Sequence, residues 1–278
     1  MSVFYNRTRR SASIPRRLLG EGKIHLIPVY YLARLSRLGR EAIERSGSYD
    51  FADHIYEGRP EGEGALGYLL DAAFLRLPIA RAFRARYLYA SSELHRLVDE
   101  TPRGRTREIL AVPCGLAREL FDLARRLESA PAQDRERVRL HGVDLDCELV
   151  ERLMRRVSGR SVNLDFSCGD ALSARAYPPG VAYDMIISLG FVEFLEDETA
   201  VRFYALVRDR LAQGGAFVTS GLARYALADY LLRNVAELRA FYRTEEDLRR
   251  LAARAGFTSI RTYQDETRLQ TMLVAGRT

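Results

Sequence analysis

The sequence contains one lysine, Lys23, among its 43 basic residues, so arginine carries nearly all of the positive charge. A net charge of +6 would suit a nucleic acid or another anionic partner. Most of the arginines, however, alternate with acidic residues on predicted helical faces, which is typical of a solvated surface. We therefore expect no nucleic-acid partner.

Cysteine is also scarce, and long apolar runs are absent. The three cysteines are Cys114, Cys147 and Cys168, and their spacing matches neither a metal site nor a disulfide framework. We therefore expect no bound metal and a location in the reducing cytoplasm. No apolar run approaches the length that crosses a bilayer, so we expect no membrane partner. The sequence does not indicate an oligomeric state.

The first hundred residues have the pattern of helices rather than of strands. Residues 1–23 are rich in arginine and contain no acid before Glu21, which predicts a basic, flexible tail. Residues 24–104 carry apolar positions at helical spacing and predict an all-helical cap or lid. Within it, residues 47–67 (GSYDFADHIYEGRPEGEGALG) are dense in glycine, acids and aromatics and predict a loop. The helices are expected over 24–46, 65–76 and 78–98.

The pattern changes at residue 109. Ile109–Val112 is a short aliphatic run, which is typical of a buried parallel strand. Pro113-Cys114-Gly115 then predicts a tight turn, and leucines three to four residues apart over Leu116–Leu127 predict a helix. Strand, turn and helix in this order open a doubly wound α/β fold, in which the turn and the helix N-terminus face a polar ligand.

Strands and helices alternate over the rest of the chain. This alternation predicts a Rossmann-like doubly wound α/β sheet over residues 105–278. We expect the sheet to be mostly parallel, with a C-terminal antiparallel strand. The further strands are expected at 138–143, 162–166, 184–188, 216–220, 258–263 and 270–275.

Polar or small residues follow the second, third and fourth of these strands. Asp144 ends the second strand, and a carboxylate there can accept hydrogen bonds from the two adjacent hydroxyls of a ribose. Asp170-Ala171 follows the third strand and offers an acid and a backbone amide to the edge of an adenine ring. Ser188-Leu189-Gly190 ends the fourth strand, next to the first, where a reacting centre would lie.

Taken together, these segments resemble the motifs of the class I S-adenosylmethionine (SAM)-dependent methyltransferases. The resemblance covers roughly residues 105–278 in the order and spacing of that family, and it implies SAM as the cofactor. It is carried by ILAVPCGLA, HGVDLD, CGDAL, YDMIISLGFVEFLED, LVRDRLAQGGAFVTSG and YRTEEDLRRLAARAGFTSI. The cofactor-binding residues that it implies are Pro113, Cys114, Gly115, Asp144, Leu145, Asp170, Ala171, Ser188, Leu189 and Gly190.

The first motif departs from the family pattern at three positions. Ala111 stands where the family usually has an acid that anchors the methionine ammonium, and Pro113 and Ala117 replace two glycines of the turn. Pro113 also removes one backbone donor from the loop. Either another residue takes over the anchoring, or the amino-acid end of SAM binds differently.

The reaction needs a nucleophile aligned with the sulfonium, protection from water and, for some acceptors, a base. Glu193 is the candidate base, and Tyr56 joins it as a candidate catalytic residue. Aromatic faces in the predicted lid can surround a sulfonium as they surround an ammonium. The lid candidates are Tyr30, Tyr31, Tyr49 and His54. Two of them, Tyr49 and His54, fall in the predicted loop, and so does the candidate catalytic residue Tyr56.

Three functions are open at this point. The first is a SAM-dependent small-molecule methyltransferase that aligns its acceptor with the methyl group under a helical lid. The second keeps the fold but uses SAM itself as substrate, closing its aminobutyrate arm to azetidine-2-carboxylate with release of methylthioadenosine. The loss of the acid at Ala111 is compatible with this cyclisation, because the attacking amine must be neutral and free to fold back. The third is a non-catalytic module that binds SAM or RNA.

Overall fold

The computed structural model describes residues 13–45, 47–100 and 105–278, which form two compact units. Unit 1 holds the described residues up to Ala85 together with Arg224–Ala240 and Glu266–Leu269. Unit 2 holds Arg86–Ala223, Phe241–Asp265 and Gln270–Thr278. The division at Ala85 lies inside a helix, whereas we predicted the border of the core at residue 105.

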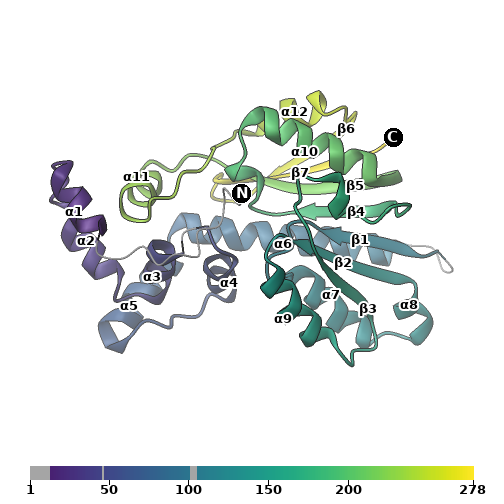
Figure 1. The fold of residues 1–278 in the computed structure, drawn as a ribbon, viewed down its shortest axis with the longest axis horizontal. Helices are drawn as coiled ribbons and strands as arrows, with labels where there is room; N and C mark the ends of the chain where they lie inside the picture. Colours follow the sequence, from purple (N-terminus) through teal and green to yellow (C-terminus); the bar gives the residue numbers. More distant parts are fainter. Residues whose placement is uncertain (1–12, 46, 101–104) are drawn as a thin grey trace. The chain divides into compact units, whose positions relative to one another are not determined.

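Unit 2 is built on one seven-stranded sheet with the order β3-β2-β1-β4-β5-β7-β6 (Figure 1). Neighbouring strands from β3 to β5 pair in parallel, and β7 pairs antiparallel with both β5 and β6. This arrangement confirms the predicted Rossmann-like sheet and its antiparallel C-terminal strand. The strands are β1 (Arg107–Ala111), β2 (Val138–Asp144), β3 (Asn163–Cys168), β4 (Tyr183–Ser188), β5 (Leu211–Leu222), β6 (Ser259–Gln264) and β7 (Gln270–Gly276).

The strand order reverses between β1 and β4. The chain moves outward from β1 through β2 to β3, and then returns to the other side of β1 as β4. In open α/β sheets, ligands bind in the crevice outside the carboxyl ends of the strands at such a switch point. The topology therefore directs attention to the residues that follow β1, β2, β3 and β4.

Helices cover the sheet of unit 2. Helix α9 packs against β2 and β3, while α10 and α12 contact each other beside β5, β6 and β7 (Figure 1). Helix α9 buries an apolar stripe that consists of Leu149, Val150 and Leu153. The helices of unit 2 are α7 (Arg118–Glu128), α8 (Ala132–Glu136), α9 (Cys147–Val157), α10 (Asp197–Arg210) and α12 (Glu245–Arg254), with short 3₁₀ turns η1 (Ala174–Ala176) and η2 (Val192–Phe194).

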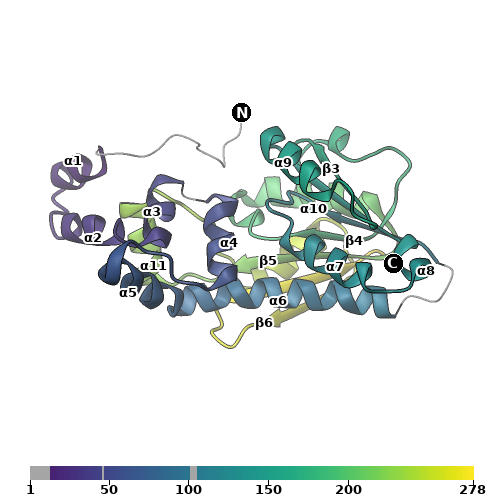
Figure 2. The same ribbon diagram turned by 90° about the horizontal axis from the view of Figure 1, so that it is seen from below.

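Unit 1 consists of helices over the part of the chain that the structure describes. Helix α6 is one continuous element that begins in this unit and ends in the other (Figure 2). The described N-terminal region is therefore helical, as its apolar spacing predicted. The helices are α1 (Ser13–Gly20), α2 (Leu26–Ala33), α3 (Arg37–Glu44), α4 (Tyr49–Glu57), α5 (Gly64–Leu75), α6 (Pro78–Asp99) and α11 (Ala226–Val235).

The structure corrects two local predictions in this region. Residues 13–20 form α1 rather than a flexible tail, because Ile14 and Leu18 lie four residues apart and bury against Tyr30 and Val235. Residues 1–12 of the predicted tail lie outside the described residues, and residues 21–23 form the turn that follows α1. Residues 49–57 form α4 rather than a loop, and the Ser48 side chain caps its first turn by accepting a hydrogen bond from the Phe51 amide.

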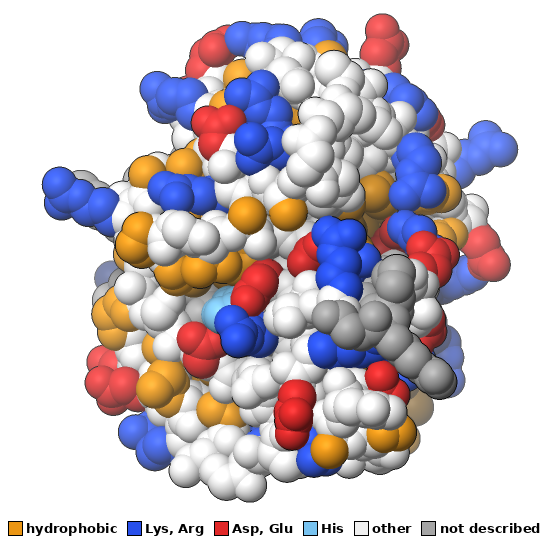
Figure 3. Space-filling view, turned by 90° about the vertical axis from the view of Figure 1, so that its right-hand side faces the viewer, with side chains coloured by type: hydrophobic (Ala, Val, Ile, Leu, Met, Phe, Trp, Pro, Cys, Tyr) orange, Lys and Arg blue, Asp and Glu red, His pale blue; other side chains and the backbone are white. Residues whose placement is uncertain are grey.

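Arginines and acids are interspersed on the surface. On the face drawn in Figure 3, Lys and Arg side chains lie among Asp and Glu side chains. Over the described residues of the whole molecule, many arginines form close pairs with acids, such as Arg37–Glu41 at 2.9 Å and Arg254–Glu198 at 2.7 Å. Exposed pairs of this kind contribute little stability. Among the helices of the described ranges, none combines the length and the hydropathy that crossing a membrane requires.

Candidate functional site

The turn after β1 is fixed between the two neighbouring strands. The Val112 amide donates to the carbonyl of Ile187 in β4, and the Cys114 amide donates to the carbonyl of Val143 in β2, each at 2.8 Å. Gly115 has a φ of +51°, a region that glycine enters without a steric penalty. The turn therefore presents the backbone of residues 113–115 at the switch point of the sheet.

Asp144, the last residue of β2, holds this turn. Its Oδ2 accepts a hydrogen bond from the Gly115 amide at 2.8 Å, and its Oδ1 accepts one from the Asp146 amide at 3.0 Å. Burial raises the pKa of Asp144, while the amides of Asp146 and Gly115 oppose that shift. Because each carboxylate oxygen has two lone pairs, Asp144 can accept further hydrogen bonds from a ligand.

The segment after β3 lies beside Asp144. The Gly169 amide donates to the carbonyl of Asp144 at 2.9 Å, so the ends of β2 and β3 are joined directly. The carboxylate of the exposed Asp170 accepts a hydrogen bond from the Leu172 amide at 2.9 Å. The hydroxyl of Tyr177 holds the buried Ala171 by donating to its carbonyl at 2.8 Å. The predicted ribose and adenine residues are thus neighbours.

The end of β4 contains an unpaired hydroxyl. Ser188 Oγ is buried and makes no hydrogen bond within the part of the chain that the structure describes, although the Ser188 carbonyl accepts one from Thr219. A buried polar atom without a partner is costly, so this hydroxyl is a group that a ligand could satisfy. Gly190, two residues further, has a φ of +71°.

Glu193, the candidate base, is paired with an arginine. Its Oε1 lies 3.1 Å from Nη1 of Arg86, a residue of α6, and the two residues are only 4% and 2% exposed. The same guanidinium lies over Gly190, where an added Cβ would be 2.8 Å from Nη1. A carboxylate in this pair must weaken its bond to Arg86 before it can accept a proton from a substrate. The arrangement therefore disfavours Glu193 as a base and favours a charge-pairing role.

A second buried arginine holds the turn that carries Glu193. Arg243 donates to the carbonyls of Val192 and Leu195, and its Nη2 lies 2.9 Å from Oδ1 of Asp197. Neither Arg86 nor Arg243 was predicted from the sequence. Nothing in the local sequence distinguishes them from the many surface arginines, because their partners are 107 and about 50 residues away.

The predicted lid residues belong to unit 1, whereas every predicted cofactor-binding residue belongs to unit 2. Tyr30 is buried in the core formed by α1, α2, α3 and α11, and its ring meets the ring of Tyr31 edge to face. Tyr31 is 57% exposed. Tyr49 and Tyr56 lie on α4 and are half-buried. Their role as a lid stays a prediction.

His54 lies at the centre of a buried polar network in unit 1. Its Nδ1 is 3.0 Å from Glu41 Oε2, and its Nε2 is 3.0 Å from the Arg59 carbonyl and 3.5 Å from Asp71 Oδ2. Asp71 in turn accepts hydrogen bonds from the hydroxyl of Ser36 and the amide of Leu38. Both ring nitrogens thus have protein partners, which favours a structural role for His54 over contact with a substrate.

This network predicts a pH-dependent contribution to stability. Burial alone would lower the pKa of His54, but the hydrogen bond to Glu41 and the charges of Glu41 and Asp71 outweigh it and raise the pKa above 6.5. A raised pKa means that folding favours the protonated ring. The stabilisation is therefore complete below pH 6.5 and is lost as the pH rises through the folded-state pKa.

Thermal unfolding of the wild type and of the His54→Gln variant between about pH 5 and about pH 9 checks this. The unfolding temperature of the wild type should exceed that of the variant most at the acidic end of this range. The difference between the two temperatures should narrow as the pH rises. A gap of constant size would contradict the assignment. The comparison with the variant is needed because His141, which lies between Glu108 and Asp165, also has a raised pKa.

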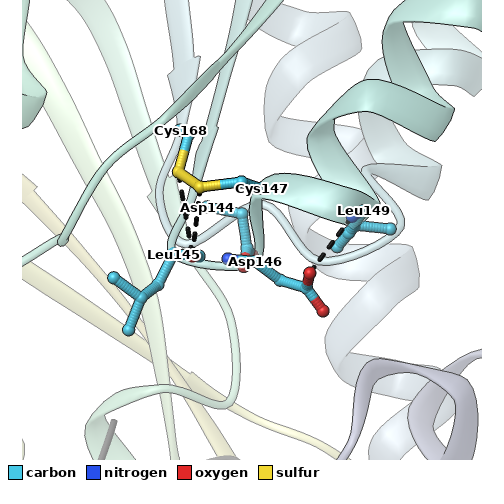
Figure 4. Close-up of a disulfide and its surroundings, with 6 residues drawn as sticks. All are labelled: Asp144, Leu145, Asp146, Cys147, Leu149 and Cys168. Carbon is cyan, nitrogen blue, oxygen red and sulfur yellow. Dashed lines mark hydrogen bonds between the residues drawn. A yellow bond between two sulfur atoms is a disulfide. The ribbon is translucent and has the colours of Figure 1, made fainter. Parts of the chain in front are cut away.

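The cysteines require a correction. Cys147 and Cys168 form a disulfide, with their Cα atoms 5.1 Å apart, whereas we predicted no disulfide (Figure 4). They come together because β2 and β3 pair in parallel and place Cys168 opposite Asp144, three residues before Cys147. We expected a reducing cytoplasm because we took the cysteines to be unpaired, and the disulfide removes that basis. Cys114 is a free, buried thiol.

No group of three or more His, Cys, Asp and Glu side chains is arranged to hold a metal ion within residues 13–45, 47–100 and 105–278. At the ends of four strands, the carboxylates, the backbone amides and the Ser188 hydroxyl can recognise a polar ligand. This is the arrangement that the motif series predicts for a bound nucleoside.

Comparisons with known proteins agree with this reading. Residues 109–215 match a family model described as a methyltransferase domain. A search of curated proteins finds no match. Among solved structures, the fold is similar to that of a possible exported protein from Bordetella parapertussis, with a TM-score of 0.73, 21% identity, and coverage of 95% of this chain and 93% of that one.

Two further structures are similar at lower scores. Magnesium protoporphyrin IX methyltransferase from Synechocystis PCC 6803 with bound SAH has a TM-score of 0.53 and 15% identity, and the match covers 81% of this chain and 93% of that one. The pyocyanin biosynthetic protein PhzM has a TM-score of 0.53 and 18% identity, with 95% and 72% covered. At these identities the likeness supports the fold. Residues 109–215, which contain the four strand ends described above, thus match a methyltransferase domain, and the motif series predicted such a domain in this part of the chain.

Proposed function

We propose that the protein is a SAM-dependent methyltransferase that acts on a small molecule. The observation that carries the proposal is the junction of three strand ends at Asp144. Its carboxylate holds the Gly115 amide, and its backbone carbonyl accepts the Gly169 amide. A nucleoside across this junction would meet the turn, the ribose-binding acid and the adenine-side segment together.

The residues present fit the nucleoside end of SAM. Asp144 has lone pairs left for ribose hydroxyls after accepting two amides. Leu145, 47% exposed, and Leu172, 36% exposed, offer apolar surface on the two segments that would flank an adenine ring. The unpaired hydroxyl of Ser188 lies at the end of β4, where the sulfonium would lie. These features support Asp144, Leu145, Asp170, Ala171 and Ser188 as cofactor-binding residues.

The methionine end of SAM has to be held without the usual acid, because position 111 is an alanine. The candidates near the ends of β1 and β4 are the backbone of residues 113–115 and the Arg86–Glu193 pair beside Gly190. Arg86 can pair with a carboxylate, and Glu193 keeps its buried charge balanced. We assign Glu193 to this balancing role, and not to proton abstraction from the acceptor.

SAM supplies a methyl group on a sulfonium, which is already a strong electrophile. The protein's contribution is therefore to bind the nucleoside, orient the two reactants and exclude water. The fold likeness to magnesium protoporphyrin IX methyltransferase and to PhzM supports a small-molecule acceptor. The helical region of unit 1, with Tyr31, Tyr49 and Tyr56, remains our candidate for the lid over the acceptor.

Product analysis separates this proposal from its alternatives. The full chain is incubated with SAM, with and without a panel of small-molecule acceptors, and the products are followed by mass spectrometry. S-adenosylhomocysteine (SAH) formed only when an acceptor is present is the expected result. Methylthioadenosine with azetidine-2-carboxylate, formed without an acceptor, would replace methyl transfer by self-cyclisation. SAM binding without turnover in any mixture would leave a non-catalytic module.

A further inference from the structure

The disulfide Cys147–Cys168 lies at the edge of the proposed nucleoside site. Cys147 is the first residue of α9 and Cys168 the last residue of β3, and both are exposed. Between Asp144 and Cys147 the chain has only two residues, Leu145 and Asp146. Figure 4 shows that the disulfide lies directly beside this short segment.

The short segment is held at both of its ends. At one end, Asp144 bonds the amides of Gly115 and Asp146. At the other, Cys147 Sγ and Cys168 Sγ approach the Leu145 carbonyl at 3.9 and 3.8 Å, along the dashed lines in Figure 4. Because disulfide sulfurs carry no hydrogen, these are close contacts rather than hydrogen bonds. The crosslink thus restrains the residue that would flank the adenine ring.

The disulfide is accessible to an attacking thiolate, and the third cysteine is not. Cys147 and Cys168 are exposed, whereas Cys114 is buried, and burial raises the pKa of its thiol. Thiol–disulfide exchange requires access to a sulfur, and thiolates form poorly in apolar surroundings. A dithiol reductant should therefore reach the disulfide, and the buried Cys114 thiol should not exchange with it.

We propose that Cys147–Cys168 is a reversible redox modification site whose oxidised state strengthens binding of the nucleoside part of SAM. The proposal rests on the function proposed above. The reductant is a dithiol. One of its thiolates attacks a cysteine sulfur, the Cys147–Cys168 bond breaks, and the released cysteine takes a proton. The second thiol of the reductant then displaces the other cysteine, so the dithiol is oxidised to a disulfide and the protein gains two thiols.

Reduction weakens binding because it removes a restraint on the Leu145-Asp146 segment. In the oxidised protein this segment is already ordered before the ligand binds. With the crosslink open, Asp146 is still held by the Asp144 carboxylate, by its cap on the Leu149 amide and by the Val150 amide, which donates to its carbonyl. The Leu145 carbonyl, in contrast, loses its fixed contact with the two bonded sulfurs. Ordering one further backbone residue on binding lowers affinity by about five- to thirtyfold. Asp144 itself stays at the end of β2, so binding is weakened and not abolished.

The test is calorimetric titration of SAH into the full chain in its oxidised and its dithiothreitol-reduced form. Intact mass distinguishes the two forms, since reduction adds about 2 Da. We expect the dissociation constant to rise about five- to thirtyfold on reduction and to return to its original value on reoxidation. The Cys147→Ser/Cys168→Ser double variant is the matched control. It should bind SAH like the reduced protein and should not respond to dithiothreitol.

The other outcomes overturn the proposal in distinguishable ways. Equal dissociation constants in two forms whose masses confirm their redox states would remove the redox effect and leave the proposed function intact. Failure of the protein to form the disulfide under oxidising conditions would also remove the redox effect and leave the proposed function intact. Absence of SAH binding in both forms would overturn the proposed function together with this inference.

Discussion

Replacing Glu193 with glutamine is expected to lower the free energy of unfolding by about 3 kcal/mol, the lower end of the range for breaking a buried ion pair. Glu193 and Arg86 are almost fully buried and lie 3.1 Å apart. The substitution keeps the size of the side chain and an acceptor oxygen, so the loss comes from removing the negative charge beside a buried guanidinium. Chemical denaturation monitored by circular dichroism measures the change.

A matched control comes from an exposed ion pair of the same unit. Glu198 is paired with Arg254 at 2.7 Å, and the side chain of Glu198 is 75% exposed. Glu198→Gln should therefore leave stability nearly unchanged. If Glu193→Gln were equally harmless, the buried pair would not contribute as we infer.

A double variant isolates the interaction between the two side chains. Arg86→Met/Glu193→Gln removes both charges, so its loss of stability should be smaller than the sum of the two single losses. The same variants examine the catalytic hypothesis. If the folded Glu193→Gln protein binds SAH as the wild type does but has lost turnover, Glu193 would again be the candidate base. Lower stability with turnover retained would support the charge-pairing role.

The sheet could be predicted because its signal is local. Aliphatic runs such as Ile109–Val112 and the run before Ser188 are short, continuous and followed by turn residues. Parallel strands buried on both faces produce this pattern, and both runs became fully buried strands. Asp144 was predicted for the same reason, since an acid that ends such a strand has a known position at the edge of the sheet.

The helices of unit 1 were harder to predict because their amino-acid composition indicates exposed loops, whereas some of their side chains are buried in the folded protein. The sequence around α4 is rich in acids and glycine and reads as a loop, yet His54 and Ile55 are buried by contacts with other helices. Helix α1 is short and arginine-rich, and its two buried residues meet Val235, more than two hundred positions away. Tertiary packing of this kind overrides local propensity.

The remaining features of the site depend on contacts between distant segments. Cys147 and Cys168 are 21 residues apart, a spacing that matches no local motif, and only the register of β2 against β3 brings them together. Arg86 and Glu193 are 107 residues apart. A pattern-based reading has no means of selecting these two residues from a chain so rich in arginine and acids.

Asp144 carries the central claim, and replacing it should have a large effect on binding. The carboxylate is expected to accept the ribose hydroxyls, and hydrogen bonds to a charged group are worth about 1.5–3 kcal/mol. It also holds the Gly115 amide at 2.8 Å, so its removal loosens the turn after β1 as well. Asp144→Ala should therefore weaken SAH binding about 10- to 100-fold.

The control is Asp165→Ala, which removes an acid from the middle of β3, where it is 69% exposed and paired with His141. A thermal scan of each variant shows that it is folded. The decisive measurement is then the calorimetric dissociation constant of SAH for the wild type, Asp144→Ala and Asp165→Ala, all in the oxidised form. We predict a rise of about 10- to 100-fold for Asp144→Ala and no change for Asp165→Ala. An unchanged constant for a folded Asp144→Ala protein would contradict the assignment of the nucleoside site.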